Sequence, residues 1–397
     1  MIPLKRLFSE GYRVFFLSAA LYALVVMVIW TGWLGIHAAG GYADLPIAMA
    51  PQLWHGHELV FGFGSAALGG FFLTAVPNWT GAKAAPTRFI ALAAGLWLLG
   101  RLAMWASGSL PAPVVALADL AFVPLLAAKI ATQLLQRPKP QNMMFLALLV
   151  LIWLANLYTH LEFMGLTDTA AQGLRAGLFA LVAMIAVLGG RVTPAFTRNA
   201  MQREGRETHL PVSHRWLELG GSGLAIALPL ASLGFAPDRL LGAIALAAGV
   251  AQLARLAGWR GGFARHQPIL LALHLSFGLV GLGLIGIGLA GFGIGSEIAA
   301  LHFLAIGGVA GMVLAMKSRA SLGHSGRALI APGPVAAAYA LLPLSALLRW
   351  LASAAPDTYY PASIAAGAVW IVAFTLSTAA LWPAFFGPRL QKPKAQP

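Results

Sequence analysis

The sequence contains no cysteine and very little charge, and both absences restrict what the protein can be. Only 10% of its 397 residues are charged, against roughly 25% in an average soluble domain. A soluble chain of this length could not cover its surface with so few charges, so we expect a polytopic membrane protein. The lack of cysteine excludes disulfides, iron–sulfur clusters, thiolate haem ligation and cysteine nucleophiles. Any metal must be held by histidine, methionine, carboxylate or backbone groups, and the ten histidines leave that open.

Apolar runs of about 20 residues, long enough to cross a bilayer, fill most of the chain. The N-terminal run is too long for a signal-peptide core and has no clear small-residue cleavage site, so it is interpreted as the first span. The longest connection on the basic side, about 190–215, divides the chain into two groups of six. The sequence therefore predicts an all-α fold, a single membrane domain over 1–397 with twelve transmembrane helices. The runs are about 14–34, 55–76, 88–107, 112–135, 142–165, 170–190, 216–235, 237–258, 266–291, 297–317, 331–352 and 362–386.

Charge in the connecting loops orients the chain. The net charge is +14, from 26 lysines and arginines against 12 acidic residues, and 21 of the 26 basic residues lie in the tails or in alternate loops. The opposite loops carry Asp44, Asp168, Asp238, Glu297 and Asp357 instead. By the positive-inside rule the basic side faces the cytoplasm, and both termini are expected there. No soluble basic domain remains, which excludes a nucleic-acid-binding protein.

Ionisable residues inside the runs are the first candidates for function, because charge within a bilayer is costly. Arg101 and Asp119 fall at similar depth near the outer ends of neighbouring runs, where they could form an ion pair that clasps two helices. Arg175 and Arg349 also lie toward outer ends. Single arginines there usually snorkel to the interface. Three arginines at one level could instead hold the carboxylates of a bound cofactor.

The densest motif, 53–58, reads LWHGHE at the mouth of the second run. Two histidines at i and i+2 point about 200° apart on a regular helix, so His55 and His57 would serve two sites, or one site and a hydrogen bond. An extended backbone, which Gly56 permits, would let both reach one ion. Neutral imidazole is the commonest metal ligand and suits copper, zinc and haem iron. We predict metal or haem ligation here, with a packing role as the alternative.

The tenth run carries another candidate ligand. His302 lies about one turn inside its outer boundary, above Gly307 and Gly311. The glycine pair is typical of close helix packing. It could also offer a flat surface to a porphyrin, with His302 above the ring, and the two interpretations are compatible.

Three further histidines form a second group of candidate ligands. His160 shares the outer depth, His274 lies in the inner half of the ninth run, and His324 lies at the inner surface. If His274 and His324 act together, a second site would lie near the inner face. For each of them a hydrogen-bonded packing role is the alternative.

Longer strings of residues resemble those of a known family. The chain is similar to NnrS, the haem- and copper-containing membrane proteins linked to the nitric oxide response, over essentially its whole length. Lys317 departs from the apolar or neutral residue expected at its position. The strings that carry the resemblance are 54–58 with Gly62 and Phe63, 74–81, 189–191 with 194–199, and 302–316 with 319–324 and 326–327.

The resemblance implies b-type haem, copper, the inner membrane of a bacterium and protection from nitrosative stress. It does not assign a metal to any one histidine. Combined with the residue patterns, it leads us to expect cofactor ligands in two tiers and arginine contacts to haem propionates. The first tier is His55, His57 and His302, the second tier is His160, His274 and His324, and the arginines are Arg101, Arg175 and Arg349.

The leading functional hypothesis is a redox protein of the lipid bilayer that binds nitric oxide at a haem or haem–copper centre. The sequence leaves open whether the protein reduces nitric oxide or only binds it. Reduction needs protons, for which Glu58 at the outer mouth is the expected relay, and electrons from a quinol or a cytochrome. One alternative is a twelve-span secondary transporter of the major-facilitator layout, with Arg101 and Asp119 as coupling residues. Another is a haem or copper handling factor that matures a different enzyme.

Overall fold

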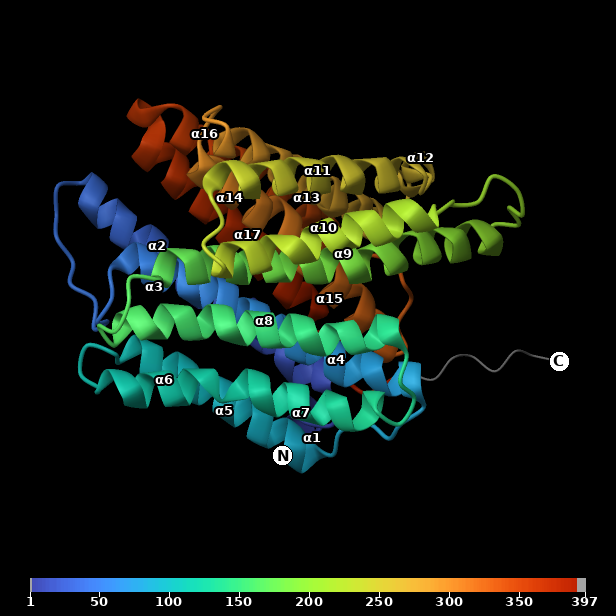
Figure 1. Ribbon diagram of the computed structural model, residues 1–397. Coiled ribbons are helices and arrows are strands. Elements are labelled where there is room, and N and C mark those ends of the chain that lie inside the picture. The colour runs from blue at the N-terminus through green and yellow to red at the C-terminus, as the bar shows by residue number, and fades with distance from the viewer. Residues whose placement is uncertain (1, 391–397) are drawn as a thin grey trace.

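Helices make up almost the whole chain, as expected where a bilayer leaves no water to satisfy backbone N–H and C=O groups. The computed structural model describes residues 2–390, and within that range it contains helices and no β-strand (Figure 1). The predicted all-α fold class is confirmed. The elements, in chain order, are α1 (Ile2–Leu7), α2 (Gly11–Ala38), α3 (Pro51–His57), η1 (Glu58–Phe63), α4 (Gly64–Thr80), α5 (Thr87–Trp105), α6 (Ala112–Leu120), α7 (Phe122–Leu134), α8 (Pro140–Phe163), α9 (Ala170–Arg203), α10 (Arg215–Leu233), α11 (Asp238–Ala257), α12 (Gly261–Ala264), α13 (Pro268–Gly291), α14 (Glu297–Phe303), η2 (Leu304–Ala310), α15 (Gly311–His324), α16 (Gly333–Ala354), η3 (Pro356–Thr358) and α17 (Tyr359–Phe386).

Twelve helical segments among the described residues are long and apolar enough to cross a membrane. Three of these spans are composite: the second joins α3, η1 and α4, the fourth joins α6 and α7, and the tenth joins α14, η2 and α15. Their number agrees with the twelve predicted runs, so the polytopic architecture is confirmed. The cytoplasmic location of both termini stays a prediction.

Helix α9 lies at the centre of the bundle, between α8 and α10 (Figure 1). Of its most apolar stretch 89% is buried, more than in any other span. Two glycines let its neighbours come close. A Cβ at Gly173 would lie 2.6 Å from the carbonyl oxygen of Ala155 on α8, and one at Gly177 would lie 2.6 Å from the ring of Phe61. The first and last spans, α2 and α17, also pack against each other, so the two ends of the chain close the bundle.

Helix α9 is longer than the sequence indicated, because it continues to Arg203. The connection to α10 is therefore 204–214 rather than about 190–215. Hydropathy falls in this stretch because arginines appear, yet cations are favourable in the last turns of a helix. Pro194 lies inside α9 without ending it, since transmembrane helices tolerate a proline where neighbouring groups satisfy the freed backbone.

The fourth span is interrupted at Ala121, between α6 and α7. Pro124 has no N–H to donate to the carbonyl of Leu120, four residues earlier. The indole Nε1 of Trp153, on α8, donates to that carbonyl instead, at 3.1 Å. This bond ties α6 to α8 next to Asp119, the penultimate residue of α6.

Two π-helical turns follow the predicted ligands of the second and tenth spans. η1 begins directly after His57, and η2 begins two residues after His302. A π turn contains one extra residue, which changes the face on which the following side chains lie, and such turns are frequent at functional sites. These two π-helical segments are therefore candidate parts of a functional site.

The two ends of the bundle differ in charge. Figure 1 shows the α2–α3 and α8–α9 connections at one end, and α12 with the 204–214 connection at the opposite end. The first end carries Asp44 and Asp168 and corresponds to the predicted outer side. The opposite end carries Arg206 and Arg260 and corresponds to the predicted inner side. We call them the outer end and the inner end.

Candidate functional site: a buried cluster of histidines and carboxylates

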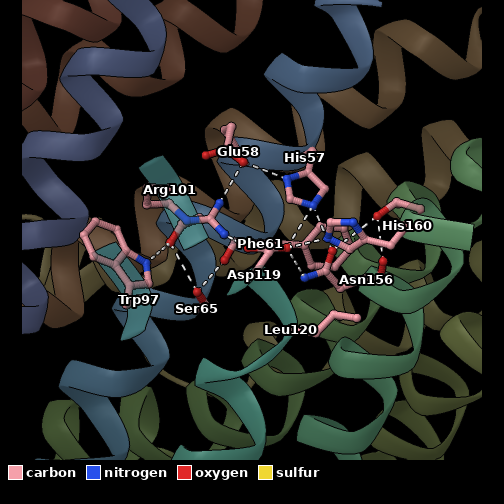
Figure 2. A network of polar contacts seen from close by, with 12 residues as sticks. His57, Glu58, Phe61, Ser65, Trp97, Arg101, Asp119, Leu120, Asn156 and His160 are labelled. Carbon is pink, nitrogen blue, oxygen red and sulfur yellow. Dashed lines mark hydrogen bonds and ion pairs between the residues drawn. The ribbon is translucent and has the colours of Figure 1, made fainter. Parts of the chain in front are cut away.

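Polar side chains from α2, α3, η1, α5, α6 and α8 meet inside the outer half of the bundle. Figure 2 shows those from α3, η1, α5, α6 and α8. Apart from the tyrosine, which is half-buried, each is at most 5% exposed. Such burial is expensive unless every polar group has a partner, so the set must act as one network. We call it the polar cluster, and its members are Tyr22, His57, Glu58, Arg101, Asp119, Asn156 and His160.

Arg101 joins the two carboxylates of the polar cluster. Its Nη1 lies 2.7 Å from Oε1 of Glu58, and its Nη2 pairs with Oδ1 of Asp119. The predicted ion pair of Arg101 and Asp119 is confirmed. Two glycines make room for it, since a Cβ at Gly62 would lie 2.8 Å from the Arg101 guanidinium and one at Gly100 would lie 3.0 Å from Asp119 Cα. The glycine in η1 thus leaves room for the guanidinium, and the glycine in α5 lets the backbone of α6 come close.

The two histidines lie on the other side of Asp119. Nε2 of His160 is 2.8 Å from Oδ2 of Asp119, and Nε2 of His57 is 3.3 Å from the same oxygen. Asn156, one turn before His160 on α8, donates Nδ2 to Oδ2 of Asp119 at 2.8 Å and presents Oδ1 to Nε2 of His57 at 2.8 Å. Residues at i and i+4 share one helix face, which explains why α8 supplies both.

Both ring nitrogens of His57 face oxygen atoms. Nδ1 lies 2.7 Å from Oε1 of Glu58, and Nε2 faces the Asn156 amide oxygen. A neutral imidazole has one donor and one acceptor nitrogen, so it cannot donate to both oxygens. The arrangement therefore needs one further proton, shared between His57 and Glu58, or a cation in its place.

The polar cluster also has the donors of a metal site. One ligand atom each from His57, Asp119 and His160 lie within 4.8 Å of one another. Ligands held at about 2.0–2.1 Å by a tetrahedral ion are roughly 3.3 Å apart, close to the separation of His57 Nε2 and Asp119 Oδ2. Two imidazoles and a carboxylate suit copper, zinc or iron. The residues present therefore fit a transition metal.

His55 lies away from His57 and does not join the polar cluster. Its ring stacks on Trp30 with 4.5 Å between centroids, and its buried Nδ1 has no hydrogen-bond partner among the described residues. His302 and Arg349 lie within electrostatic range of it. Nδ1 of His302 donates to the carbonyl of Ile298 at 2.8 Å, which leaves Nε2 as its acceptor nitrogen. The i, i+2 pair thus serves two places, the polar cluster and a second group near His302.

The second-tier histidines are dispersed. His160 belongs to the polar cluster. His274 lies on α13, where its Nε2 is 2.9 Å from the Thr197 hydroxyl, and the ring of His324 packs against Tyr12 at the inner end. Within residues 2–390 no hydrogen bond or ring contact joins His274 to His324.

The three predicted propionate arginines already have protein partners. Arg101 pairs with the carboxylates of the polar cluster, and Arg175 lies 3.1 Å from Glu297. Nη1 of Arg349 donates to the Ser353 hydroxyl at 2.6 Å. Their role toward haem stays a prediction, and any propionate would have to compete with these contacts.

Sequence reasoning missed two members of the polar cluster. Asn156 is not among the predicted residues, although a polar residue four before His160 in an apolar run is a usable signal. Tyr22, whose hydroxyl donates to Oε2 of Glu58, gave no signal, because a tyrosine in a span is commonly packing. Asp119 was considered only as the partner of Arg101, and its contacts to both histidines depend on how α6 packs against α3 and α8.

Comparison with known proteins identifies one family. Residues 6–389 match the family described as NnrS protein, which is nearly the whole chain. Neither the curated proteins nor the solved structures contain a match. The match over nearly the whole length agrees with the twelve apolar helices of a multi-pass membrane protein. On this evidence, the chain belongs to the NnrS family.

Proposed function

We propose that this protein is a bacterial inner-membrane protein that binds copper in the polar cluster and b-type haem near His55 and His302, and that it binds nitric oxide to protect against nitrosative stress. Membership of the NnrS family supports the link with nitric oxide. The observation that carries the metal assignment is the buried group of His57, Asp119 and His160. For haem, the supporting observation is the buried Nδ1 of His55, which has no hydrogen-bond partner within residues 2–390.

Charge balance supports a cation in the polar cluster. Glu58 and Asp119 are two carboxylates against the single guanidinium of Arg101, so with neutral histidines the cluster carries one net negative charge. An uncompensated charge inside a bilayer is costly. One proton shared between His57 and Glu58, or one monovalent copper ion, would cancel it. Loading the metal would therefore displace a proton rather than add a charge.

The chain's own residues supply the groups needed to move protons at this site. The Tyr22 hydroxyl donates a hydrogen bond to Glu58, and Glu58 contacts His57. These three titratable side chains therefore form a continuous hydrogen-bonded chain. Before the metal binds, Asn156 orients His57 by accepting a hydrogen bond from its Nε2. A bound copper ion would provide a place for a diatomic ligand and a source of one electron. Reduction of nitric oxide would in addition need a quinol or a cytochrome as donor.

A proton-coupled transporter is the second candidate. The observation in its favour is the same negative charge, because a cluster that accepts one proton can couple proton movement to transport. It predicts substrate flux in vesicles that depends on Asp119 and is indifferent to His55 and His302. A haem or copper handling factor is the third candidate, and it predicts that metal leaves during purification.

Metal analysis of the purified protein tests the proposal. From cells replete in haem and copper, wild type should retain both cofactors. His57→Ala and His160→Ala should weaken copper binding by at least roughly the 10–100-fold that loss of a metal's supporting contact costs. The same variants should keep haem, whereas His55→Ala should lose haem and keep copper. His214→Ala, exposed at the inner end, is the control.

The outcomes separate the proposals. Wild type without either cofactor would reject the metal-binding function. If His57→Ala and His160→Ala retain copper, the copper site must lie outside the polar cluster. A reduced optical spectrum that is unchanged by nitric oxide would reject nitric oxide as the haem ligand.

A further inference from the structure

A cavity of about 670 Å³ opens at the inner end of the bundle, far along the spans from the polar cluster. It lies where the α9–α10 connection meets the turn around α12, and Figure 1 shows both at the same end. Pockets for small molecules are typically about 300–1,000 Å³, so the volume suits a ligand. The ionisable residues that line it are Glu204, Arg206, His209, Arg260, Arg265 and His266.

The lining has an excess of positive charge. Three guanidinium groups face one carboxylate, which leaves a net charge of +2 even with both histidines neutral. Glu204 accepts a hydrogen bond from Gln267 at 2.8 Å and lies 4.0 Å from Arg206 Nε. In the part of the chain that the structure describes, no carboxylate lies within ion-pairing distance of Arg260 or Arg265. The cavity is therefore suited to an anion.

The backbone of the cavity is strained at two of its basic positions. His209 has a φ of 53° and Arg260 a φ of 59°, and within residues 2–390 only one other non-glycine residue has positive φ. This conformation is unfavourable for a residue with a Cβ, and such residues are found disproportionately at ligand sites. Glycine would adopt it freely. The backbone alone therefore does not explain an arginine at position 260.

The depth of the cavity indicates where its ligand comes from. Met201 and Ala257 line it from the ends of the apolar helices α9 and α11, and Phe263 lines it from α12. The Arg206 guanidinium lies 5.1 Å from the Phe263 ring centroid. The basic side chains of the cavity thus lie where the apolar part of the spans ends. Basic pockets between helices on the cytoplasmic side are typical binding sites for anionic lipid head groups.

We propose that this cavity binds the phosphate of an anionic phospholipid of the inner leaflet, with Arg260 and Arg265 as its main contacts. The planar guanidinium matches phosphate oxygens with two parallel hydrogen bonds. The site is separate from the polar cluster and does not depend on the function proposed for it. A soluble phosphate has the same chemistry, so the test includes an arm for each source.

The test measures phosphatidylglycerol bound to the full-length protein, by native mass spectrometry after extraction from phosphatidylcholine vesicles that contain phosphatidylglycerol. Arg260→Gln with Arg265→Gln should lower the apparent affinity about tenfold or more, since one lost charged hydrogen bond already approaches tenfold. Arg215→Gln, an arginine at the same end that does not line the cavity, should leave it unchanged.

Arg260→Gly separates binding from folding. Glycine removes the guanidinium but suits the left-handed backbone, so this variant should melt at the wild-type temperature or above it and still lose the lipid. Equal binding of phosphatidylglycerol by wild type and by the folded variants would overturn the proposal. Inorganic phosphate that binds while phosphatidylglycerol does not would identify a soluble ligand and overturn the lipid assignment. Phosphate that competes with the lipid would support the head group as the recognised part.

Discussion

The unequal number of opposite charges determines how individual residues of the polar cluster behave. Arg101 is the only permanent cation among them and contacts both carboxylates. Removing one partner of a buried ion pair leaves an uncompensated charge, which costs more than the pair itself contributes. The two ends of the Arg101–Asp119 pair should therefore respond differently to substitution.

Arg101→Gln should destabilise the protein more than Asp119→Asn does. The first change leaves two buried carboxylates without their permanent cation and should cost about 3–5 kcal/mol. The second leaves Glu58 and Arg101 as a neutral pair and should cost clearly less. Thermal unfolding in detergent measures both effects.

Arg175→Gln is the matched control, since the partners of Arg175 are 36% and 82% exposed. Its effect should stay below about 1 kcal/mol. Equal destabilisation by Arg101→Gln and Asp119→Asn would contradict the charge balance described for the polar cluster.

At the scale of helices, irregular backbone brings the polar cluster together. The extra residue of η1 follows His57, and the break between α6 and α7 follows Asp119. Inside a bilayer, each freed backbone group at such irregularities needs a new partner. Trp153 supplies it for Leu120. In η1, the Gly62 carbonyl accepts the indole N–H of Trp97 at 2.9 Å and the Ser65 hydroxyl at 3.3 Å.

A double-mutant cycle tests the break between α6 and α7. Trp153→Phe should cost about 1–3 kcal/mol in wild type, because the Leu120 carbonyl loses its donor. Pro124→Ala restores a backbone N–H at the position that can reach this carbonyl, so in that background Trp153→Phe should cost much less. Thermal unfolding of the four proteins gives the coupling. Trp97→Phe should cost the same in both backgrounds, and additive effects of Trp153→Phe would rule out the shared carbonyl.

For the whole molecule, the asymmetry of loop charge predicts the orientation in the membrane. The outer end carries Asp44 and Asp168, whereas the inner end carries most of the arginines. The positive-inside rule then places the inner end in the cytoplasm. The polar cluster would then lie in the outer half of the membrane, and the proposed lipid site would face the inner leaflet.

The absence of cysteine makes this orientation directly testable. Single cysteines can be introduced by Asp168→Cys at the outer end and Glu207→Cys at the inner end, both exposed positions. A membrane-impermeant maleimide should label the first in intact spheroplasts and the second only after permeabilisation. The reverse pattern would show that the chain is inserted the other way round.

The sequence determined the number and type of the spans. Hydropathy is a property of consecutive residues, so it can be calculated from the sequence without knowledge of the fold. The twelve apolar runs correspond to twelve helices. It also predicted the Arg101–Asp119 pair, because residues of opposite charge at equal depth on consecutive spans have few other partners. Helix α9 continues beyond the apolar run that ends near 190, because hydropathy detects the membrane boundary and not the end of hydrogen bonding.

Only the tertiary structure decided which polar residues meet. His57 and Asn156 are 99 positions apart in the chain, yet their side chains are 2.8 Å apart. That contact depends on the rotation of α3 relative to α8, on the π turn after His57 and on the break after Asp119. Helix rotation is set by side-chain packing between elements, which the order of residues along one helix does not specify. For the same reason, tertiary structure assigned His55 and His57 to two different places.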